Sequence, residues 1–325
     1  MEPIIALLKD TSNDSWKEAL TKWCDENNSV WNFTEKYTLE TKETFVALLC
    51  DKLVALSSED EVTPLLLALR LCLRDAGGLS SAVNNPEVTK KVITISGICG
   101  DGKKVNIDGL RVVINLISKS TKVKQLLIEE FNVCEGVIRL ISYIDPSERE
   151  TLFLLYRIAV NLSLDNEKVS SILRKDDAVY RSIERDVCPL IPLFKSENAA
   201  LFNPPMATEA LKLLFSLTMH GGPLASGGET PLSDHERNGL IALFPFFDVV
   251  LSARVSGGEK EDSLSSCEDE KYRQGRLDLK VAVVDCLLNL PKDQLGAIVP
   301  KEMLMRTVDN LLVCAEEALV DEKKM

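Results

Sequence analysis

In three segments of this 325-residue chain a basic side chain lies four residues before an amide or hydroxyl side chain, and in a fourth segment two arginines lie four residues apart. Residues at that spacing share one face of a helix, so each pair would be presented together. Arginine holds a carboxylate through two parallel hydrogen bonds, and asparagine both donates to and accepts from a peptide backbone. This combination favours binding of a peptide ligand. The four pairs are Arg70/Arg74, Arg111/Asn115, Arg157/Asn161 and Lys212/Ser216.

An ordinary explanation of the same pattern stays open. Arginines are common on solvated helix faces, and asparagines can satisfy helix ends within a helical stack. The formal net charge is −12, from 38 basic and 50 acidic residues, so a basic stripe would be a local exception. The same net charge argues against binding to a nucleic-acid backbone. A related segment has Asp285 four residues before Asn289, so we expect the basic stripe to end there.

Other arrangements that support chemistry are missing from the sequence. None of the nine cysteines forms a CxxC pair, and neither histidine, His220 or His235, has a nucleophile at a recognisable spacing. GxGxxG, P-loop and HExxH motifs are absent. The run ISGICGDGKKV (95–105) lacks the Gly-Lys-Ser/Thr order, and we interpret it as a helix end and loop. We therefore expect no catalytic residue, no metal site and no cofactor, and we interpret the cysteines as buried small apolar residues.

Helices must position the basic pairs, because apolar residues recur every three or four positions through most of the chain. The stretch from Leu110 to Ile117 shows this spacing, and short polar breaks separate one such stretch from the next. Asp145, which precedes Pro146, and Asp165 are expected to cap the helices that follow them.

One phrase recurs along the chain, a long apolar helix that ends in Asn-Leu or a close equivalent. It reads GLRVVINLIS around Asn115 and LLYRIAVNLS around Asn161, with relatives around Arg70, Ser216 and Asn289. The intervals between successive members are 45, 46, 55 and 73 residues, and the first two match the roughly 40–47 residues of an armadillo or HEAT repeat. A short helix and then a medium helix are expected between the long ones. The sequence therefore predicts an all-α, armadillo/HEAT-type right-handed superhelical solenoid whose long helices line a concave groove.

The chain is expected to form a single solenoid domain over residues 1–325. Residues 1–60 would be capping helices that shield the open end of the stack. All three tryptophans, Trp16, Trp23 and Trp31, fall in this region. They would either close the core or form an aromatic patch that binds a partner.

An insertion is expected at 221–275, where the repeat spacing is stretched. It combines glycine pairs, a helical stretch at 234–254 and a flexible acidic loop at 256–275. Ser265 and Ser266 each have an acid three residues further on, a pattern that suits an acid-directed kinase. They are candidate phosphorylation sites, and the alternative is an unmodified solvated loop.

The sequence also carries information about location. No stretch approaches 18 apolar residues, so no membrane span is expected. The N-terminus MEPIIALLKD has no basic n-region and only a five-residue apolar run, which is not typical of a signal peptide. We expect a cytoplasmic protein with reduced cysteines.

The repeat phrases resemble successive repeat helices of the synembryn family, over roughly 60–315. That family consists of cytosolic armadillo-type exchange factors and folding chaperones for heterotrimeric G-protein α subunits (Gα). The resemblance implies that the groove holds the C-terminal helix of Gα, with Arg70, Arg74 and Asn115 at positions that the family uses for this contact. The phrases are LRLCLRDAG (69–77), GLRVVINLIS (109–118), TLFLLYRIAVNLS (151–163), EALKLLFSLTM (209–219) and DCLLNLP (285–291).

The mechanism implied by the resemblance is indirect. The exchange factor grips the Gα helix that packs against the nucleotide site, which loosens that site and releases GDP. The exchange factor itself binds no nucleotide and is not an enzyme. We expect a monomer that is cytoplasmic or held at the plasma membrane through the G protein.

The chain also departs from the family. Members are longer and continue with further repeats and a segment that engages the rest of Gα, whereas this chain stops at Met325. The chain would then be a fragment or a natural short form, able to bind the Gα tail with or without exchange activity. The family's acidic phosphorylated segment lies further towards the C-terminus, so that role is not transferred to Ser265 or Ser266. The alternative function is an armadillo-repeat adaptor that binds another peptide or helix and has no exchange activity.

Overall fold

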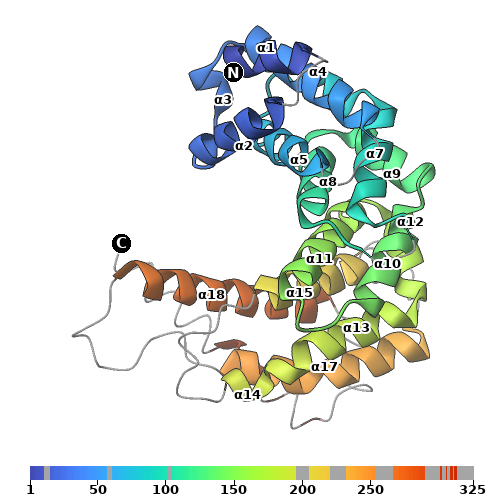
Figure 1. Ribbon diagram of the computed structural model, residues 1–325. Helices are drawn as coiled ribbons and strands as arrows, with labels where there is room; N and C mark the ends of the chain where they lie inside the picture. Colours follow the sequence, from blue (N-terminus) through green and yellow to red (C-terminus); the bar gives the residue numbers. More distant parts are fainter. Residues whose placement is uncertain are drawn as a thin grey trace. The chain divides into compact units, whose positions relative to one another are not determined.

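The computed structural model is all-α in every part of the chain that it describes, and it confirms the predicted fold class of stacked helical repeats (Figure 1). Two compact units are present, Met1–Leu140 and Ile141–Met325. The structure describes residues 1–10, 15–56, 61–100, 104–194, 205–219, 232–252, 266–289, 301, 305, 308, 309, 311 and 312.

The N-terminal unit stacks its helices in two rows. Helices α2, α5 and α8 pack against one another in order in the first row, and α4 packs against α7 in the second. Leucines and valines such as Leu66, Leu69 and Val113 are buried between them. The helices are α1 (Glu2–Lys9), α2 (Trp16–Asn27), α3 (Phe33–Lys36), α4 (Leu39–Ala55), α5 (Val62–Cys72), α6 (Ser80–Val83), α7 (Pro86–Ser96), α8 (Ile107–Lys119) and α9 (Thr121–Glu129), and α10 (Val133–Tyr143) begins here.

Hydrogen bonds in this unit run between residues one repeat apart. The Asn115 amide nitrogen donates to the backbone carbonyl of Arg70 at 3.2 Å, and the Lys119 ammonium donates to that of Arg74 at 3.1 Å. Both bonds join residues 45 positions apart. The period predicted from the sequence is therefore the distance in sequence at which α8 contacts α5.

The side chains that begin and end the helices account for their boundaries. Asn85, Asn106 and Ser120 accept a backbone N–H in the first turn of α7, α8 and α9 respectively. Helix α7 ends at Gly97, whose φ of 83° is left-handed and whose added Cβ would lie 2.4 Å from the Lys104 carbonyl oxygen. The interpretation of this glycine-rich run as a helix end and loop is confirmed for its described residues.

The described residues among the first 60 form helices that complete the N-terminal end of the core. Trp16 and Trp23 are buried there, whereas Trp31 is 74% exposed. Two of the three tryptophans therefore belong to the core, as one of the two alternatives predicted. Trp31 lies on the surface, where the guanidinium carbon of Arg74 is 4.8 Å from the centre of its ring.

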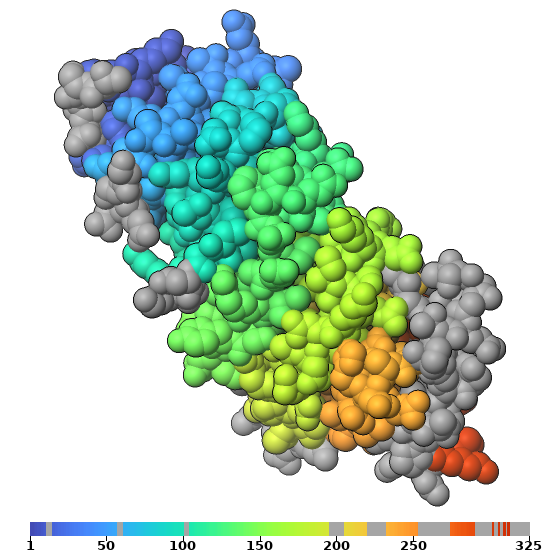
Figure 2. All heavy atoms as spheres, turned by 90° about the vertical axis from the view of Figure 1, so that its right-hand side faces the viewer, coloured from blue at the N-terminus to red at the C-terminus, as the bar shows by residue number. Residues whose placement is uncertain are grey.

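The C-terminal unit shows the predicted order of short, medium and long helices. Long helices α11, α15 and α18 pack against one another in order (Figure 1). Medium helices α13 and α17 pack side by side, and Figure 2 shows their surfaces next to each other, yellow-green beside orange. The elements are α11 (Arg149–Ser163), α12 (Glu167–Lys175), α13 (Asp177–Val187), a 3₁₀ turn η2 (Cys188–Leu190), α14 (Ile191–Phe194), α15 (Pro205–Met219), α17 (Asp234–Ser252) and α18 (Ser266–Asn289).

The predicted insertion at 221–275 needs correction in two places. The helix expected at 234–254 is α17, but it packs on α13, α14 and α18 as the medium helix of a repeat, because its buried side is apolar. Residues 266–275 are helical in α18, so the prediction of a flexible loop is wrong for that part of 256–275. The rest of that loop lies outside the described residues, as does Ser265, whereas Ser266 is the first residue of α18.

Both predicted acidic N-caps are wrong. The Asp145 carboxylate accepts from the backbone N–H and hydroxyl of Ser147 in a turn, and α11 begins only at Arg149. Asp165 has a left-handed φ of 58°, and its neighbour Asn166 caps α12 instead. Aspartate and asparagine side chains are common both in turns and at helix N-caps. The residue type alone therefore does not show whether such a residue caps a helix or lies in a turn.

Candidate partner-binding faces

A basic surface on α5 and α8, called here the α5–α8 face, gathers half of the predicted binding residues. Arg70 and Arg74 extend from the last turn of α5 and just beyond it, and Arg111 and Asn115 lie one turn apart on α8. All four side chains are partly exposed, while the opposite side of α8 is buried. The face consists of Arg70, Arg74, Asp108, Arg111, Asn115 and Lys119.

One carboxylate serves two arginines on this face. An Asp108 carboxylate oxygen lies 3.0 Å from Arg111 and 3.8 Å from Arg70. The Arg70 side chain is only 19% exposed, and its buried Nε–H has no hydrogen-bond partner among the described residues. A buried donor without an acceptor is costly. The α5–α8 face therefore keeps a surplus of positive charge and an unused arginine donor.

Arg74 has a different role from Arg70. Its guanidinium donates to the backbone carbonyls of Asn28 at 2.6 Å and Val30 at 2.8 Å, and it stacks on the Trp31 ring. Burial and the nearby charge of Arg70 lower the pKa of Arg74. Arg74 thus holds the segment after α2 in place, and fewer of its N–H donors remain for a partner.

The two predicted pairs of the C-terminal unit lie in unlike surroundings. Arg157 is exposed on α11, 5.8 Å from the ring centre of Phe153, and Asn161 is half-buried one turn further on. Lys212 on α15 is exposed and forms an ion pair with Glu209 at 2.9 Å. Three of these four predicted residues are therefore at least partly accessible.

Ser216 is the exception, and its prediction as a partner-binding residue is wrong. Its side chain is 0% exposed, and its hydroxyl lies 2.5 Å from the Ser163 hydroxyl and 3.2 Å from the Leu213 carbonyl oxygen. Helix α15 packs between α11 and α18, which covers two of its faces. A serine can satisfy its hydroxyl inside such an interface, so it need not face solvent.

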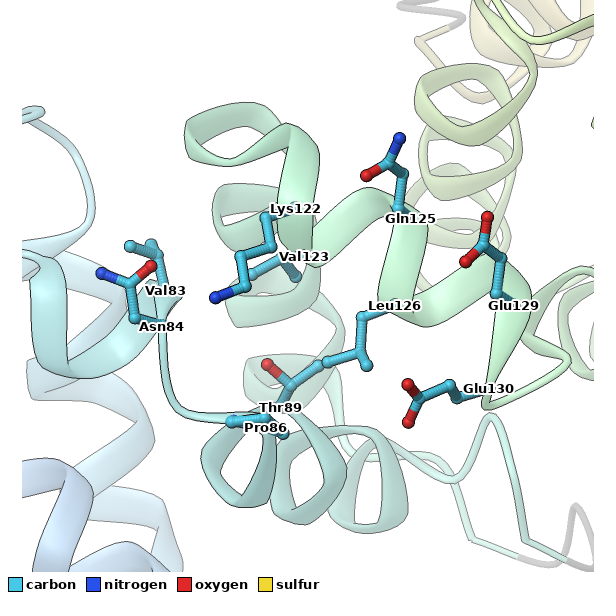
Figure 3. Close-up of a pocket in the computed structure, with 10 residues that line it drawn as sticks. All are labelled: Val83, Asn84, Pro86, Thr89, Lys122, Val123, Gln125, Leu126, Glu129 and Glu130. Carbon is cyan, nitrogen blue, oxygen red and sulfur yellow. The ribbon is translucent and has the colours of Figure 1, made fainter.

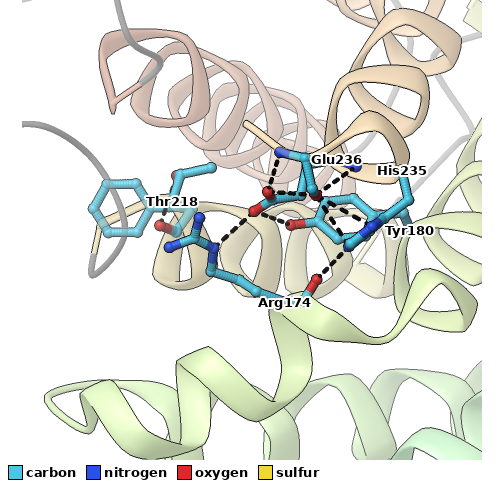
Figure 4. Close-up of polar contacts among 7 residues, drawn as sticks. Arg174, Tyr180, Thr218, His235 and Glu236 are labelled. Carbon is cyan, nitrogen blue, oxygen red and sulfur yellow. Dashed lines mark hydrogen bonds and ion pairs between the residues drawn. The ribbon is translucent and has the colours of Figure 1, made fainter. Parts of the chain in front are cut away.

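A polar cluster in the C-terminal unit was not predicted from the sequence (Figure 4). Glu236 is buried and accepts from Arg174 Nε at 2.7 Å, from the Ser233 hydroxyl at 2.6 Å and from the Ser233 backbone N–H at 2.8 Å. His235 Nε2 lies 2.7 Å from the Arg174 carbonyl oxygen. These bonds join the end of α12 to the start of α17. Contacts between residues about 60 positions apart leave no local signal in the sequence.

This cluster makes the stability of the C-terminal unit depend on pH. Burial opposes ionisation of Glu236, but hydrogen bonds from Arg174 and Ser233 outweigh it and hold the pKa of Glu236 below its ordinary value of 4.5. A lowered folded-state pKa stabilises the fold above about pH 4.5, and that contribution is lost as the pH falls through the folded value. Glu236→Gln should therefore cost about 1–2 kcal/mol at pH 7, and the difference from wild type should shrink below pH 4.5.

Urea unfolding followed by circular dichroism at pH 7 and pH 3.5 checks this expectation. Glu167→Gln, an exposed acid in the first turn of α12, is the matched control. A Glu236→Gln deficit of equal size at both pH values would contradict the charge-based account.

Most of the described cysteines are buried, as predicted, but the prediction is wrong for Cys99, which is exposed, and Cys188 is only half-buried. Cys24, Cys50, Cys72, Cys134 and Cys286 are buried free thiols. Burial raises the pKa of Cys24 and of Cys50 to about 12, so neither thiol ionises near neutral pH. No group of three or more metal-binding side chains occurs within the described ranges.

Among the described helices, none has the combination of length and hydrophobicity that crossing a membrane requires. Neither family models nor curated proteins match this chain. Two solved structures that resemble it are crystal structures of engineered proteins from the Northeast Structural Genomics Consortium. One has a TM-score of 0.41 and 14% identity, covering 88% of this chain and 96% of its own. The other has a TM-score of 0.35 and 14% identity, covering 98% and 91%. These likenesses are too distant to carry an argument about function.

Proposed function

We propose that this chain is a guanine nucleotide exchange factor and folding chaperone for Gα, and that it binds the C-terminal helix of Gα on the α5–α8 face. The structural observation that supports the proposal is Arg70, whose buried Nε–H has no partner and whose ion pair with Asp108 spans 3.8 Å. A carboxylate from a bound peptide would complete this arginine's hydrogen bonding. The sequence resemblance to the synembryn family supplies the identity of the partner.

The residues of the α5–α8 face would have different roles in binding the Gα helix. Arg70 and Arg111, which share the Asp108 carboxylate, would both contact the partner's carboxylate. Asn115 holds the end of α5 through the Arg70 carbonyl, so it would position Arg70 as well as line the face. Binding would pull the Gα helix away from the nucleotide site and release GDP without any catalytic group on this chain.

The second candidate function is an adaptor that binds another acidic peptide, because the unpaired Nε–H of Arg70 could equally donate to a carboxylate of that peptide. The two functions differ in the partner and in GDP release. Binding of synthetic peptides that correspond to Gα C-terminal helices separates them directly.

Arg70→Gln and Arg111→Gln are each expected to weaken binding of such a peptide by roughly 10-fold, about 1.4 kcal/mol, with a smaller loss at high salt. Glutamine is preferable to glutamate because a new carboxylate would face Asp108. Lys90→Gln, at an exposed position on α7, is the matched control and should bind like wild type. Fluorescence anisotropy with labelled peptides measures all three. No binding by the folded wild type, or wild-type affinity in Arg70→Gln, would contradict the proposal.

A further inference from the structure

A small pocket of about 220 Å³ lies between α6, α7 and α9 in the N-terminal unit (Figure 3). It shares no residue with the α5–α8 face. Its volume is below the roughly 300–1,000 Å³ of pockets for drug-sized ligands, so it suits a small molecule. The lining residues are Val83, Asn84, Pro86, Thr89, Lys122, Val123, Gln125, Leu126, Glu129 and Glu130.

The pocket contains a buried hydroxyl that lacks a partner. Thr89 is 1% exposed, and its Oγ1 makes no hydrogen bond to any described residue. Thr94, one turn further along α7, shows the usual alternative, since its hydroxyl donates to the Lys90 carbonyl at 2.9 Å. Figure 3 shows the Thr89 oxygen among the lining side chains, between Asn84 and Leu126. A buried polar atom that no protein group satisfies leaves a hydrogen-bonding position open to a water molecule, an ion or a ligand atom.

Opposite charges stand at the two ends of the pocket. Lys122 and Glu130 lie on either side of Thr89 in Figure 3, and neither forms an ion pair with another residue that the structure describes. Glu130, the residue just after α9, lies eight positions after Lys122, which is about 12 Å along the helix axis. Val123 and Leu126 supply apolar surface between the two charges.

We propose that this pocket binds a small linear zwitterion, with its carboxylate at Lys122, its ammonium at Glu130 and a polar atom or bound water at Thr89. The opposite charges select a ligand with both groups, and the spacing requires a short aliphatic chain between them. The same chemistry occurs in a free amino acid with a terminal amine and in a peptide that ends in lysine.

A binding titration with 6-aminohexanoate tests the pocket, with hexanoate and hexylamine as probes that carry one charge each. Isothermal calorimetry on the full chain should show that the zwitterion binds at least 10-fold more tightly than either. A short N-acetylated peptide ending in lysine is titrated alongside. Tighter binding of that peptide assigns the pocket to a chain end, and tighter binding of 6-aminohexanoate assigns it to a free small molecule.

Thr89→Val is the decisive variant, because it removes the unpaired hydroxyl and keeps the shape of the side chain. It should weaken zwitterion binding at least 5-fold while leaving the thermal midpoint unchanged or higher. Thr94→Val, on the same helix outside the pocket, should bind like wild type. The proposal is overturned if 6-aminohexanoate shows no saturable binding, if hexanoate or hexylamine binds equally well, or if Thr89→Val binds like wild type.

Discussion

Replacing Asp75 by asparagine is expected to lower the free energy of unfolding of the N-terminal unit by about 3–5 kcal/mol. Asp75 is the only carboxylate among the described residues that pairs with Lys42, whose side chain is 0% exposed. The same carboxylate accepts the backbone N–H groups of Phe33 at 2.5 Å and Thr34 at 3.3 Å, where α3 begins. Asparagine still accepts those N–H groups, but it leaves the lysine charge buried and uncompensated.

A second substitution separates the charge from the hydrogen bonds. Adding Lys42→Met to Asp75→Asn removes the buried charge, so the double variant should regain most of the lost stability. Tryptophan fluorescence during urea unfolding reports this unit, because all three tryptophans lie between residues 16 and 31. A double variant no more stable than Asp75→Asn would show that the ion pair is not the cause.

Asp186→Ala is expected to lower the free energy of unfolding of the C-terminal unit by about 3–4 kcal/mol. The fully buried Asp186 carboxylate accepts from the Tyr156 hydroxyl at 2.7 Å and from Arg185 Nε at 2.7 Å. Burial, followed by the charge of Asp186, raises the pKa of Tyr156 well above its ordinary value, so this hydroxyl remains a donor. Alanine would leave both donors without their acceptor in the interior.

The wider role of Arg185 adds to this cost. Its guanidinium also donates to the backbone carbonyls of Ile141 at 2.8 Å and Ser142 at 3.0 Å, at the end of α10. Arg139, 46 positions earlier, donates in the same way to the Ile98 carbonyl beyond α7. These two arginines hold successive helix ends, and Asp186 orients the second of them.

Tyr156→Phe provides the graded control for Asp186→Ala. It removes one donor and leaves Asp186 paired with Arg185, so a loss of only about 1–2 kcal/mol is expected. Circular dichroism follows both units, whereas tryptophan fluorescence follows the N-terminal unit alone. A loss seen only by circular dichroism locates the effect in the C-terminal unit. Equal losses in Tyr156→Phe and Asp186→Ala would contradict the role given to Arg185.

The helical repeats could be predicted well from the sequence because the spacing of apolar residues within each helix indicates them. The 45-residue interval between Arg70 and Asn115 predicted a contact between α5 and α8, and a hydrogen bond joins those two residues. Helices α9, α10 and α11 followed from the same apolar spacing. Periodicity fixes which side of a helix is apolar, and that is enough to order a stack.

The sequence was less informative about how individual polar residues are used. Ser216 fits the repeat position but lies in the core, because α15 is covered on two sides. Arg74 fits it too, yet most of its hydrogen bonds go to the segment after α2. No sequence pattern singles out Asp186 or Glu236, because Tyr156 and Arg174, which donate to them, lie on other helices. Burial and long-range pairing depend on neighbours that no single helix pattern specifies.

The rate of GDP release from purified Gα subunits, measured with and without this chain, tests the central proposal most directly. Labelled GDP should leave at least one class of Gα several-fold faster in the presence of the wild-type chain. Arg70→Gln should reduce that acceleration, and Lys90→Gln should not. An unchanged release rate with every Gα class, from a chain that is folded and binds the Gα peptides, would contradict exchange activity and leave a peptide-binding adaptor.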